Sequence, residues 1–176
     1  MRLFIGAPVP ETFAHELARA ARRIETGGAR WTPPENMHLT LVFLGEVAEQ
    51  RVHAIVTTLA DVDTTPFAVK ITGLGGFERA GVLFAEVEPV PRLLRLQAQI
   101  AERMTGSGFT LELRPYHPHI TLARFRSPVL LKREAMLPSE LKRSFRFEAV
   151  NLYRSRPAAT GAVYEVIAQL GIRTLN

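Results

Sequence analysis

Apolar and polar residues alternate along this chain with two different periods, and each period predicts its own kind of element. Runs of apolar, β-branched and aromatic residues bounded by turn residues predict strands. These strands cover residues 2–7, 37–44, 67–72, 82–88, 119–125, 145–153 and 163–170. Apolar residues that recur three and four positions apart predict helices. These helices cover residues 13–24, 52–59 and 93–104, and a short, interrupted helix containing Pro138 is expected over residues 130–142.

Glycines mark the places where several of these elements end. Gly27 and Gly28 follow the first helix, and Gly106 and Gly108 follow the third. The run Gly73-Leu74-Gly75-Gly76 is expected to connect two of the strands. No segment has the composition of a long flexible linker, so we expect a single domain over residues 1–176.

One four-residue pattern occurs twice, each time on a predicted strand. His38-Leu39-Thr40-Leu41 recurs as His119-Ile120-Thr121-Leu122, 81 positions later in a chain of 176 residues. The matched placement predicts two related α+β lobes, each of which contributes one strand to a shared central cleft.

Composition narrows the classes of protein to which the chain can belong. Hydrophobic residues make up 47% and charged residues 22%, the balance of a globular domain rather than of a disordered or fibrous chain. No apolar run approaches the roughly 20 residues of a membrane-spanning helix, and the apolar start of the chain is too short for a signal peptide. We therefore expect no membrane association and a cytoplasmic location.

Cysteine is absent, which excludes a disulfide framework, a thiolate nucleophile and a cysteine-bound metal. The formal net charge of +5 favours partners that bear phosphate. Charge alone leaves open whether such a partner is a nucleic acid. Nothing in the sequence indicates a protein partner, and we expect a monomer.

The repeated pattern carries the candidate chemistry. Side chains two positions apart on a strand point to the same face, so His38 and Thr40 project together, as do His119 and Thr121. Histidine titrates near neutrality, so one imidazole can act as a base while the other acts as an acid. Threonine hydroxyls can donate hydrogen bonds to phosphate oxygens as charge develops on them. Four such groups can transfer a phosphoryl group without a metal or another cofactor.

Two other interpretations of the histidines stay open. A single His-x-Thr on a strand is usually structural, and the pair has functional weight only because both copies lie at matched places. His117-Pro118-His119 also has the spacing of a metal-binding pair. Pro118 is more typical of a strand start, and no cluster of acidic residues stands ready to complete a coordination shell, so we expect no metal.

Further residues are candidates for binding a substrate. Arg124 follows the second motif and can reach a phosphate if the strand bends there. Aromatic side chains near the motifs can stack on bases. The aromatic candidates are Phe43, Phe77, Phe84 and Trp31.

The residues around both motifs resemble those of a known family. The segments that carry the likeness are His38 to Gly45, Pro118 to Arg124, the approach Trp31 to Met37, and the shorter runs Arg2 to Gly6, Gly73 to Phe77, Tyr153 to Ser155 and Tyr164 to Val166. They resemble the two-histidine phosphoesterases, and within them the bacterial and archaeal RNA 2′,3′-cyclic phosphodiesterases, also called 2′-5′ RNA ligases.

The resemblance implies a two-lobed fold, with an antiparallel sheet in each lobe and helices on the outer faces. It also implies an enzyme that opens cyclic phosphates on RNA ends without a metal. It implies that His38 protonates the leaving 3′ oxygen, that His119 activates water, and that Thr40 and Thr121 hold the phosphate. Arg124 matches the family's arginine after the second motif. Phe84 departs from the family, which often has tryptophan there.

The leading hypothesis is therefore an RNA 2′,3′-cyclic phosphodiesterase that acts on tRNA-like ends, with reverse 2′-5′ ligation left open. One alternative is a phosphodiesterase for small cyclic nucleotides or 2′-5′ oligonucleotides that uses the same four residues. The other is an RNA-binding module whose motifs do not catalyse. The sequence leaves the physiological RNA and any base preference undetermined.

Overall fold

A computed structural model describes residues 1–24, 27–112, 114–126, 138–158 and 161–171. Its strands are β1 (Arg2–Pro8), β2 (Arg30–Trp31), β3 (His38–Glu46), β4 (Ala68–Phe77), β5 (Val82–Val87), β6 (His119–Arg124), β7 (Ser144–Arg146), β8 (Val150–Ala158) and β9 (Gly161–Leu170). Its α-helices are α1 (Glu11–Ala21), α2 (Val52–Thr58) and α3 (Pro91–Gly106). Short 3₁₀ turns are η1 (Pro34–Asn36), η2 (Glu49–Arg51), η3 (Glu78–Ala80) and η4 (Ser139–Leu141).

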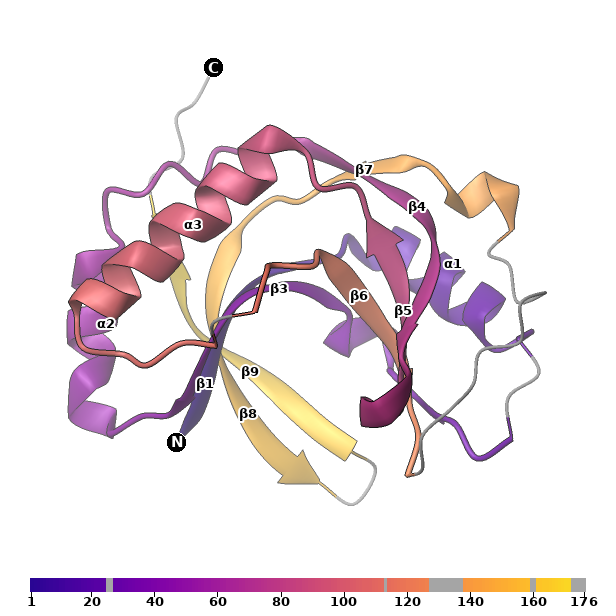
Figure 1. Ribbon diagram of the computed structural model, residues 1–176, viewed down its shortest axis with the longest axis horizontal. Coiled ribbons are helices and arrows are strands. Elements are labelled where there is room, and N and C mark those ends of the chain that lie inside the picture. The colour runs from indigo at the N-terminus through magenta and orange to yellow at the C-terminus, as the bar shows by residue number, and fades with distance from the viewer. Residues whose placement is uncertain (25–26, 113, 127–137, 159–160, 172–176) are drawn as a thin grey trace.

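The strands form two antiparallel halves that meet in the middle of one sheet. The strand order is β7-β4-β5-β6-β3-β1-β8-β9, and β2 pairs with β6. Strands β3 and β6 join the halves through one register pair, Leu39 opposite Ile120. Figure 1 shows the halves curving away from this junction, with β4 and β5 on one side and β8 and β9 on the other. The predicted α+β fold with two antiparallel lobes is confirmed.

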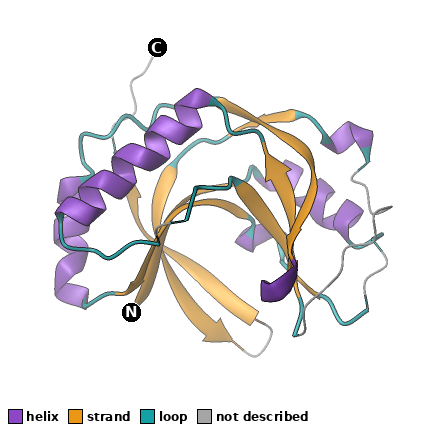
Figure 2. Cartoon of the chain, in the orientation of Figure 1, coloured by secondary structure: helices purple, strands orange, loops and turns teal. Residues whose placement is uncertain are grey.

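Helices α1 and α3 each cover the half of the sheet from which they do not start. Helix α1 follows β1, but its Phe13 stacks on Phe145 of β7, and its Glu16 forms an ion pair with Arg143 beside that strand. Helix α3 follows β5, but it packs against β3. Figure 2 shows the strands in the middle of the molecule and the helices around them. This exchange ties the two halves together through packing as well as through the β3–β6 pair.

The apolar positions of the predicted helices form the core under the sheet. Among the most buried helical residues are Leu17 of α1 and Leu93, Ile100 and Met104 of α3, each 0–1% exposed. They share one cluster with Leu39, Ile120 and the other sheet residues that point away from the histidines. The outer face of the sheet is therefore closed by helices, and the histidine face stays free for a site.

Two predicted elements differ from the structure. The glycine run 73–76 is part of β4 rather than a connection. The turn falls at η3, which is followed by Gly81 with φ 58°. The strand predicted over 145–153 is two strands, because β7 pairs with β4 in one half and β8 pairs with β1 in the other. The chain crosses between the halves at residues 147–149, so one straight strand cannot serve both.

The helix expected over 130–142 lies largely outside the described residues, which resume at Pro138. The described part contains one 3₁₀ turn, η4, directly after that proline. Within the described ranges, no helix has both the length and the apolar character needed to span a membrane.

Gly75 gives a test of the packing that sets the site. A Cβ atom built on Gly75 lies 2.4 Å from the Phe84 ring and 2.9 Å from Oε1 of Glu86. We expect Gly75→Ala to displace Phe84 and to lower the free energy of unfolding by about 1–3 kcal/mol, the usual cost of overpacking. Denaturant titration measures this change.

Gly73→Ala is the matched control, since its Cβ meets only Oε2 of Glu86, at 3.4 Å. We expect this variant to stay within about 0.5 kcal/mol of the unaltered protein. Equal losses in the two variants would show that the Phe84 contact is not the cause.

Candidate active site

The two repeated motifs lie on neighbouring strands and face the same side. Leu39 and Ile120 are opposite one another and are buried on the core side. One position to either side of this pair, His38 comes opposite Thr121, and Thr40 comes opposite His119. The sheet therefore brings both imidazoles and both hydroxyls to one face, as the alternation in the sequence predicts.

Each motif ends in a β-bulge at the same position. Ile5 pairs with Val42 and Gly6 with Thr40, which leaves Leu41 without a partner on β1. In the other half Leu83 pairs with Ala123 and Phe84 with Thr121, which leaves Leu122 as the extra residue. An extra residue reverses the alternation of the side chains beyond it. The side chains that follow the bulge on each strand therefore point to the face opposite to the one that a regular alternation would predict.

The bulges bring Arg124 and Phe43 to the histidine face. Arg124 lies opposite Val82, which shares a face with Phe84, the partner of Thr121. The positive charge of Arg124 also acts on both histidines, whose pKa values it lowers. Phe43 holds the equivalent place in the other motif and lies opposite Phe4. The strand bend that Arg124 needs to approach a phosphate is therefore present, and it occurs in both motifs.

Backbone carbonyls fix both imidazoles in the same way. Nδ1 of His38 lies 2.7 Å from the carbonyl oxygen of Asn36, and Nδ1 of His119 lies 2.7 Å from that of His117. A carbonyl oxygen only accepts, so Nδ1 carries the proton and donates it. Nε2 of each neutral ring is left as the proton acceptor. Both rings are therefore oriented to exchange a proton through Nε2.

Aromatic side chains surround both imidazoles. The ring of His38 lies 4.7 Å from that of Phe4 and 4.9 Å from that of Tyr164, measured between centroids. The ring of His119 lies 5.1 Å from Phe77 and 4.9 Å from Phe84. These contacts hold the rings in place and remove water from them.

Burial shifts the titration of both histidines. Loss of hydration lowers the pKa of His38 to about 4, and the charges of His119 and Arg124 act in the same direction, against the stabilising bond to Asn36. Burial likewise lowers the pKa of His119, with the charges of His117 and Arg124 acting in the same direction. Both rings are therefore neutral at pH 7 in the free protein, and an anion between them would favour protonation.

Thr40 and Thr121 are half-buried and lie on the same face of the sheet as the imidazoles. Thr40 lies opposite Gly6, and Thr121 lies opposite Phe84. The hydroxyl of Tyr116 donates to the backbone oxygen of Thr40 at 2.9 Å, which fixes β3 at this point. Burial raises the pKa of Tyr116, so this donor stays protonated.

The four aromatic candidates have different surroundings. Phe43 is 52% exposed, and its ring lies 5.9 Å from that of Phe4. Phe77 is half-buried and contacts His119, whereas Phe84 is 2% exposed, and its ring supports His119 rather than facing solvent. Trp31 lies opposite Ala123, and its ring packs against the core, away from the histidine face.

His117 is exposed and lies beside the pair. Its ring centroid is 6.3 Å from that of His119, and its carbonyl already accepts the Nδ1 proton of His119. Among the described residues no three histidine, cysteine, aspartate or glutamate side chains are grouped as a metal site. The structure therefore gives His117 a role in holding His119 through its backbone.

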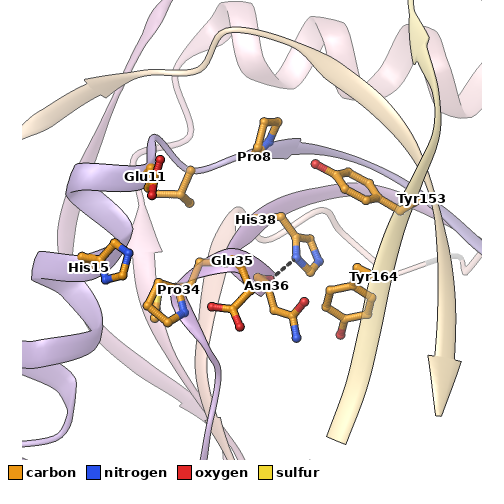
Figure 3. Close-up of a pocket in the computed structure, with 11 residues that line it drawn as sticks. Pro8, Glu11, His15, Pro34, Glu35, Asn36, His38, Tyr153 and Tyr164 are labelled. Carbon is orange, nitrogen blue, oxygen red and sulfur yellow. Dashed lines mark hydrogen bonds between the residues drawn. The ribbon is translucent and has the colours of Figure 1, made fainter. Parts of the chain in front are cut away.

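Several residues that shape the His38 side have no site role predicted from the sequence, although their segments carry the family likeness. Phe4, Tyr153 and Tyr164 come from β1, β8 and β9, far from the motif in sequence. Tyr153 and Tyr164 also line a cavity of about 280 Å³ beside His38, shown in Figure 3 with Glu11, His15, Glu35 and Asn36. The carbonyls that accept from the two imidazoles belong to Asn36 and His117, each two residues before its histidine. This shared spacing is the one feature of the sequence that could have indicated them.

A symmetrical α+β fold with paired imidazoles on its open face defines the class of two-histidine phosphoesterases, a class of hydrolases. More narrowly, the chain belongs to the 2′-5′ RNA ligase superfamily, whose family model matches residues 9–158. The family expected from the sequence is thereby confirmed.

Individual proteins agree with this assignment. The RNA 2′,3′-cyclic phosphodiesterase of Bacillus subtilis (strain 168) is 36% identical over 128 residues, which cover 69% of this chain and 69% of that protein. The protein of the same name from Thermotoga maritima is 31% identical over 179 residues, covering 95% and 93%. The crystal structure of TT0787 of Thermus thermophilus is similar with a TM-score of 0.80 and 30% identity, covering 98% of each chain.

The titration of His38 gives a direct test of the site. In the ligand-free protein we expect its imidazole to titrate with a pKa of about 4, because burial opposes the charged form. Saturating phosphate should raise this pKa, since the anion stabilises the imidazolium. Proton NMR of the imidazole Cε1–H measures both values, with His38→Gln assigning the resonance. A His38 that titrates near 6.5 in the free protein would contradict the described burial.

The same shift has a consequence for stability. The unfolded chain takes up a proton on His38 near pH 6.5, whereas the folded protein does so only near pH 4. The free energy of unfolding should therefore fall between these values as the pH is lowered, and His38→Gln should remove that part of the dependence.

Proposed function

We propose that this protein hydrolyses the 2′,3′-cyclic phosphate at the end of an RNA chain and leaves a 2′-phosphate. The observation that carries the proposal is that both imidazoles are oriented by the same hydrogen bond. In each, Nδ1 donates to the backbone carbonyl two residues earlier. The Nε2 atoms of the two imidazoles form no hydrogen bond with any described residue. Two such imidazoles, on opposite sides of one sheet junction, suit an acid and a base acting on one phosphate. The names of the relatives from Bacillus subtilis and Thermotoga maritima support this choice of substrate.

The proposed reaction uses each imidazole once. Nε2 of His119 takes a proton from water, and the resulting hydroxide oxygen forms a bond to phosphorus. The bond from phosphorus to the 3′ oxygen breaks, and Nε2 of His38 gives its proton to that oxygen. The two histidines exchange protonation states, and a proton transfer through solvent restores them. The ring of the cyclic ester holds the leaving oxygen in place, which lowers the demand on the protein.

Proton supply to His38 depends on the substrate. In the free protein burial holds the pKa of His38 at about 4, which leaves the ring without a second proton at pH 7. A bound phosphate diester carries a negative charge, which raises the pKa of a neighbouring imidazole. Protonation of His38 is therefore coupled to binding of the anion, so the acid forms where the phosphate lies.

Three further side chains would bind the phosphate group. The hydroxyls of Thr40 and Thr121 lie on the same face as the imidazoles and can donate to the non-bridging oxygens. Arg124, exposed and turned to this face by its bulge, adds positive charge and a forked donor. Phe43 offers its exposed ring to the base of the terminal nucleotide.

The proposal extends to RNA ends like those of cleaved tRNA, with the protein acting as a monomer in the cytoplasm. No metal or cofactor is needed, since the two imidazoles supply the acid and the base. With the 5′ hydroxyl of a second RNA strand in place of water, the same groups would open the 2′,3′-cyclic phosphate, release the 3′ oxygen and form a 2′-5′ linkage.

Loss of either imidazole should nearly abolish hydrolysis. We expect His38→Gln and His119→Gln each to lower kcat by at least about 100-fold, the contribution of one acid or base. Thr40→Val and Thr121→Val should each lower kcat by about 100-fold, the lower end of the effect of losing one donor to the developing charge. Turnover of a trinucleotide with a 2′,3′-cyclic phosphate measures these effects.

His53→Gln is the control, because His53 is exposed on α2, away from both motifs. Near-normal turnover in a histidine variant of either motif would remove that residue from the catalytic pair. Absence of turnover in the unaltered protein, with RNA still bound, would favour a binding module.

The identity of the leaving oxygen tests the roles of the two histidines. Acid and base lie on opposite sides of the phosphate, so a substrate held in one orientation loses only one of its two ester bonds. We expect a pure 2′-phosphate product, resolved from the 3′ isomer by chromatography. A pure 3′-phosphate would require the roles of His38 and His119 to be exchanged, and a mixture would show that the ribose is not held in one orientation.

A further inference from the structure

A second pocket, separate from the histidines, is lined by arginines. It has a volume of about 570 Å³ and lies where the β8–β9 hairpin, the start of β1 and the short strand β2 come together. The arginines are Arg2 of β1, Arg30 of β2, and Arg154 and Arg156 of β8. Figure 1 shows this hairpin projecting from the body of the molecule, with the N-terminus beside its base.

Most of this positive charge is not neutralised within the described parts of the chain. Arg156 pairs with Glu165 at 2.8 Å, and Glu46 pairs with the amino group of Met1 at 3.4 Å. Arg2, Arg30 and Arg154 form no ion pair with any described residue. Arg2 lies opposite Glu46 and Arg154 lies opposite Glu165 in the strand register, so the four arginines around the pocket outnumber the two carboxylates beside them. Because guanidinium groups bind phosphate through two parallel hydrogen bonds, this excess of arginine points to an anionic ligand.

The pocket adjoins the candidate active site along two strands. Arg2 shares a face of β1 with Phe4, which contacts His38, and lies about 7 Å further along the strand. Arg30 of β2 lies directly opposite Arg124 of β6, so the two side chains are on the same face of the sheet. Positive groups therefore continue from the site of the phosphate into the pocket.

The hairpin makes the same connection from the other side. Tyr164 of β9 contacts His38, and Ala162, two residues earlier, lines the pocket. The carbonyl oxygen of Ala162 accepts a hydrogen bond from Nδ2 of Asn36 at 2.8 Å, and Asn36 is the residue that anchors His38. The pocket is thus held at a fixed position relative to the imidazoles.

We propose that Arg2, Arg30 and Arg154 bind the backbone phosphates of the RNA strand upstream of its cyclic end, so that the enzyme selects oligonucleotides over mononucleotides. The proposal rests on the proposed function, because the imidazoles fix where the chain ends. Contacts to phosphate position a nucleic acid without reading its sequence. The pocket therefore selects for the presence of an upstream chain and leaves base preference unchanged.

Three substrates test the proposal. They are 2′,3′-cyclic AMP, a trinucleotide with a 2′,3′-cyclic phosphate end, and the same trinucleotide with its internal phosphates replaced by neutral methylphosphonates. We expect kcat/KM to be highest for the charged trinucleotide. The methylphosphonate form should lose most of that advantage, because it keeps the bases and riboses but not the upstream charge.

Substitutions locate the effect on the protein. Arg2→Gln, Arg30→Gln and Arg154→Gln should each lower the ratio of kcat/KM for the trinucleotide to that for the mononucleotide about two- to fivefold, the range of exposed ion pairs. The triple variant should lose most of the ratio. Arg95→Gln is the matched control, because Arg95 is exposed on α3, which covers the other face of the sheet.

Each outcome separates this proposal from the proposed function. Equal kcat/KM for all three substrates, or a ratio that survives in the triple variant, would overturn the arginine pocket while leaving the hydrolysis intact. No turnover of any substrate by the unaltered protein would contradict the hydrolysis instead. In that case, fluorescence anisotropy with a labelled trinucleotide would test the pocket by measuring affinity. If the arginines bind the RNA, the affinity must fall in the triple variant and stay unchanged in Arg95→Gln.

Discussion

The pairing of β3 with β6 is the interaction on which the rest of the site depends. A single register pair, Leu39 opposite Ile120, joins the two halves of the sheet, and both side chains are buried in the core. Antiparallel neighbours are related by a local two-fold axis, so this pair places each histidine opposite the threonine of the other motif. A slip of one residue would turn these side chains into the core. The core therefore fixes the register, and the register assembles the site.

The two motifs share their backbone and differ in their surroundings. Both have a bulge at the fourth residue and both histidines donate to a carbonyl two residues earlier. The residue that each bulge turns toward the site is Phe43 in one half and Arg124 in the other. A symmetrical frame thus presents an apolar ring on one side of the phosphate position and a cation on the other. This difference gives the two imidazoles unequal neighbours, which suits the different roles proposed for them.

Burial of the imidazoles connects packing with chemistry. Aromatic rings exclude water from both histidines and lower their pKa values, so the free site holds two neutral bases beside one arginine. In the proposed reaction, a negatively charged substrate raises the pKa of His38, and the imidazole gains a proton as the substrate binds. The residues that hold the rings, Phe4 and Phe84, are themselves buried at 2% exposure. The same contacts therefore stabilise the fold and set the protonation of the site.

The sequence by itself determined the strands that carry the motifs, the shared face of His38, Thr40, His119 and Thr121, and the family. These features are local, because the alternation of side chains along a strand depends only on the strand. The tertiary structure decided the rest. The bulges that turn Arg124 and Phe43 to the site, the glycine that lets Phe84 support His119, and the arginine pocket under the β8–β9 hairpin all arise from pairing between strands distant in sequence. Such pairing depends on which strands become neighbours and in what register, and only the folded sheet fixes both.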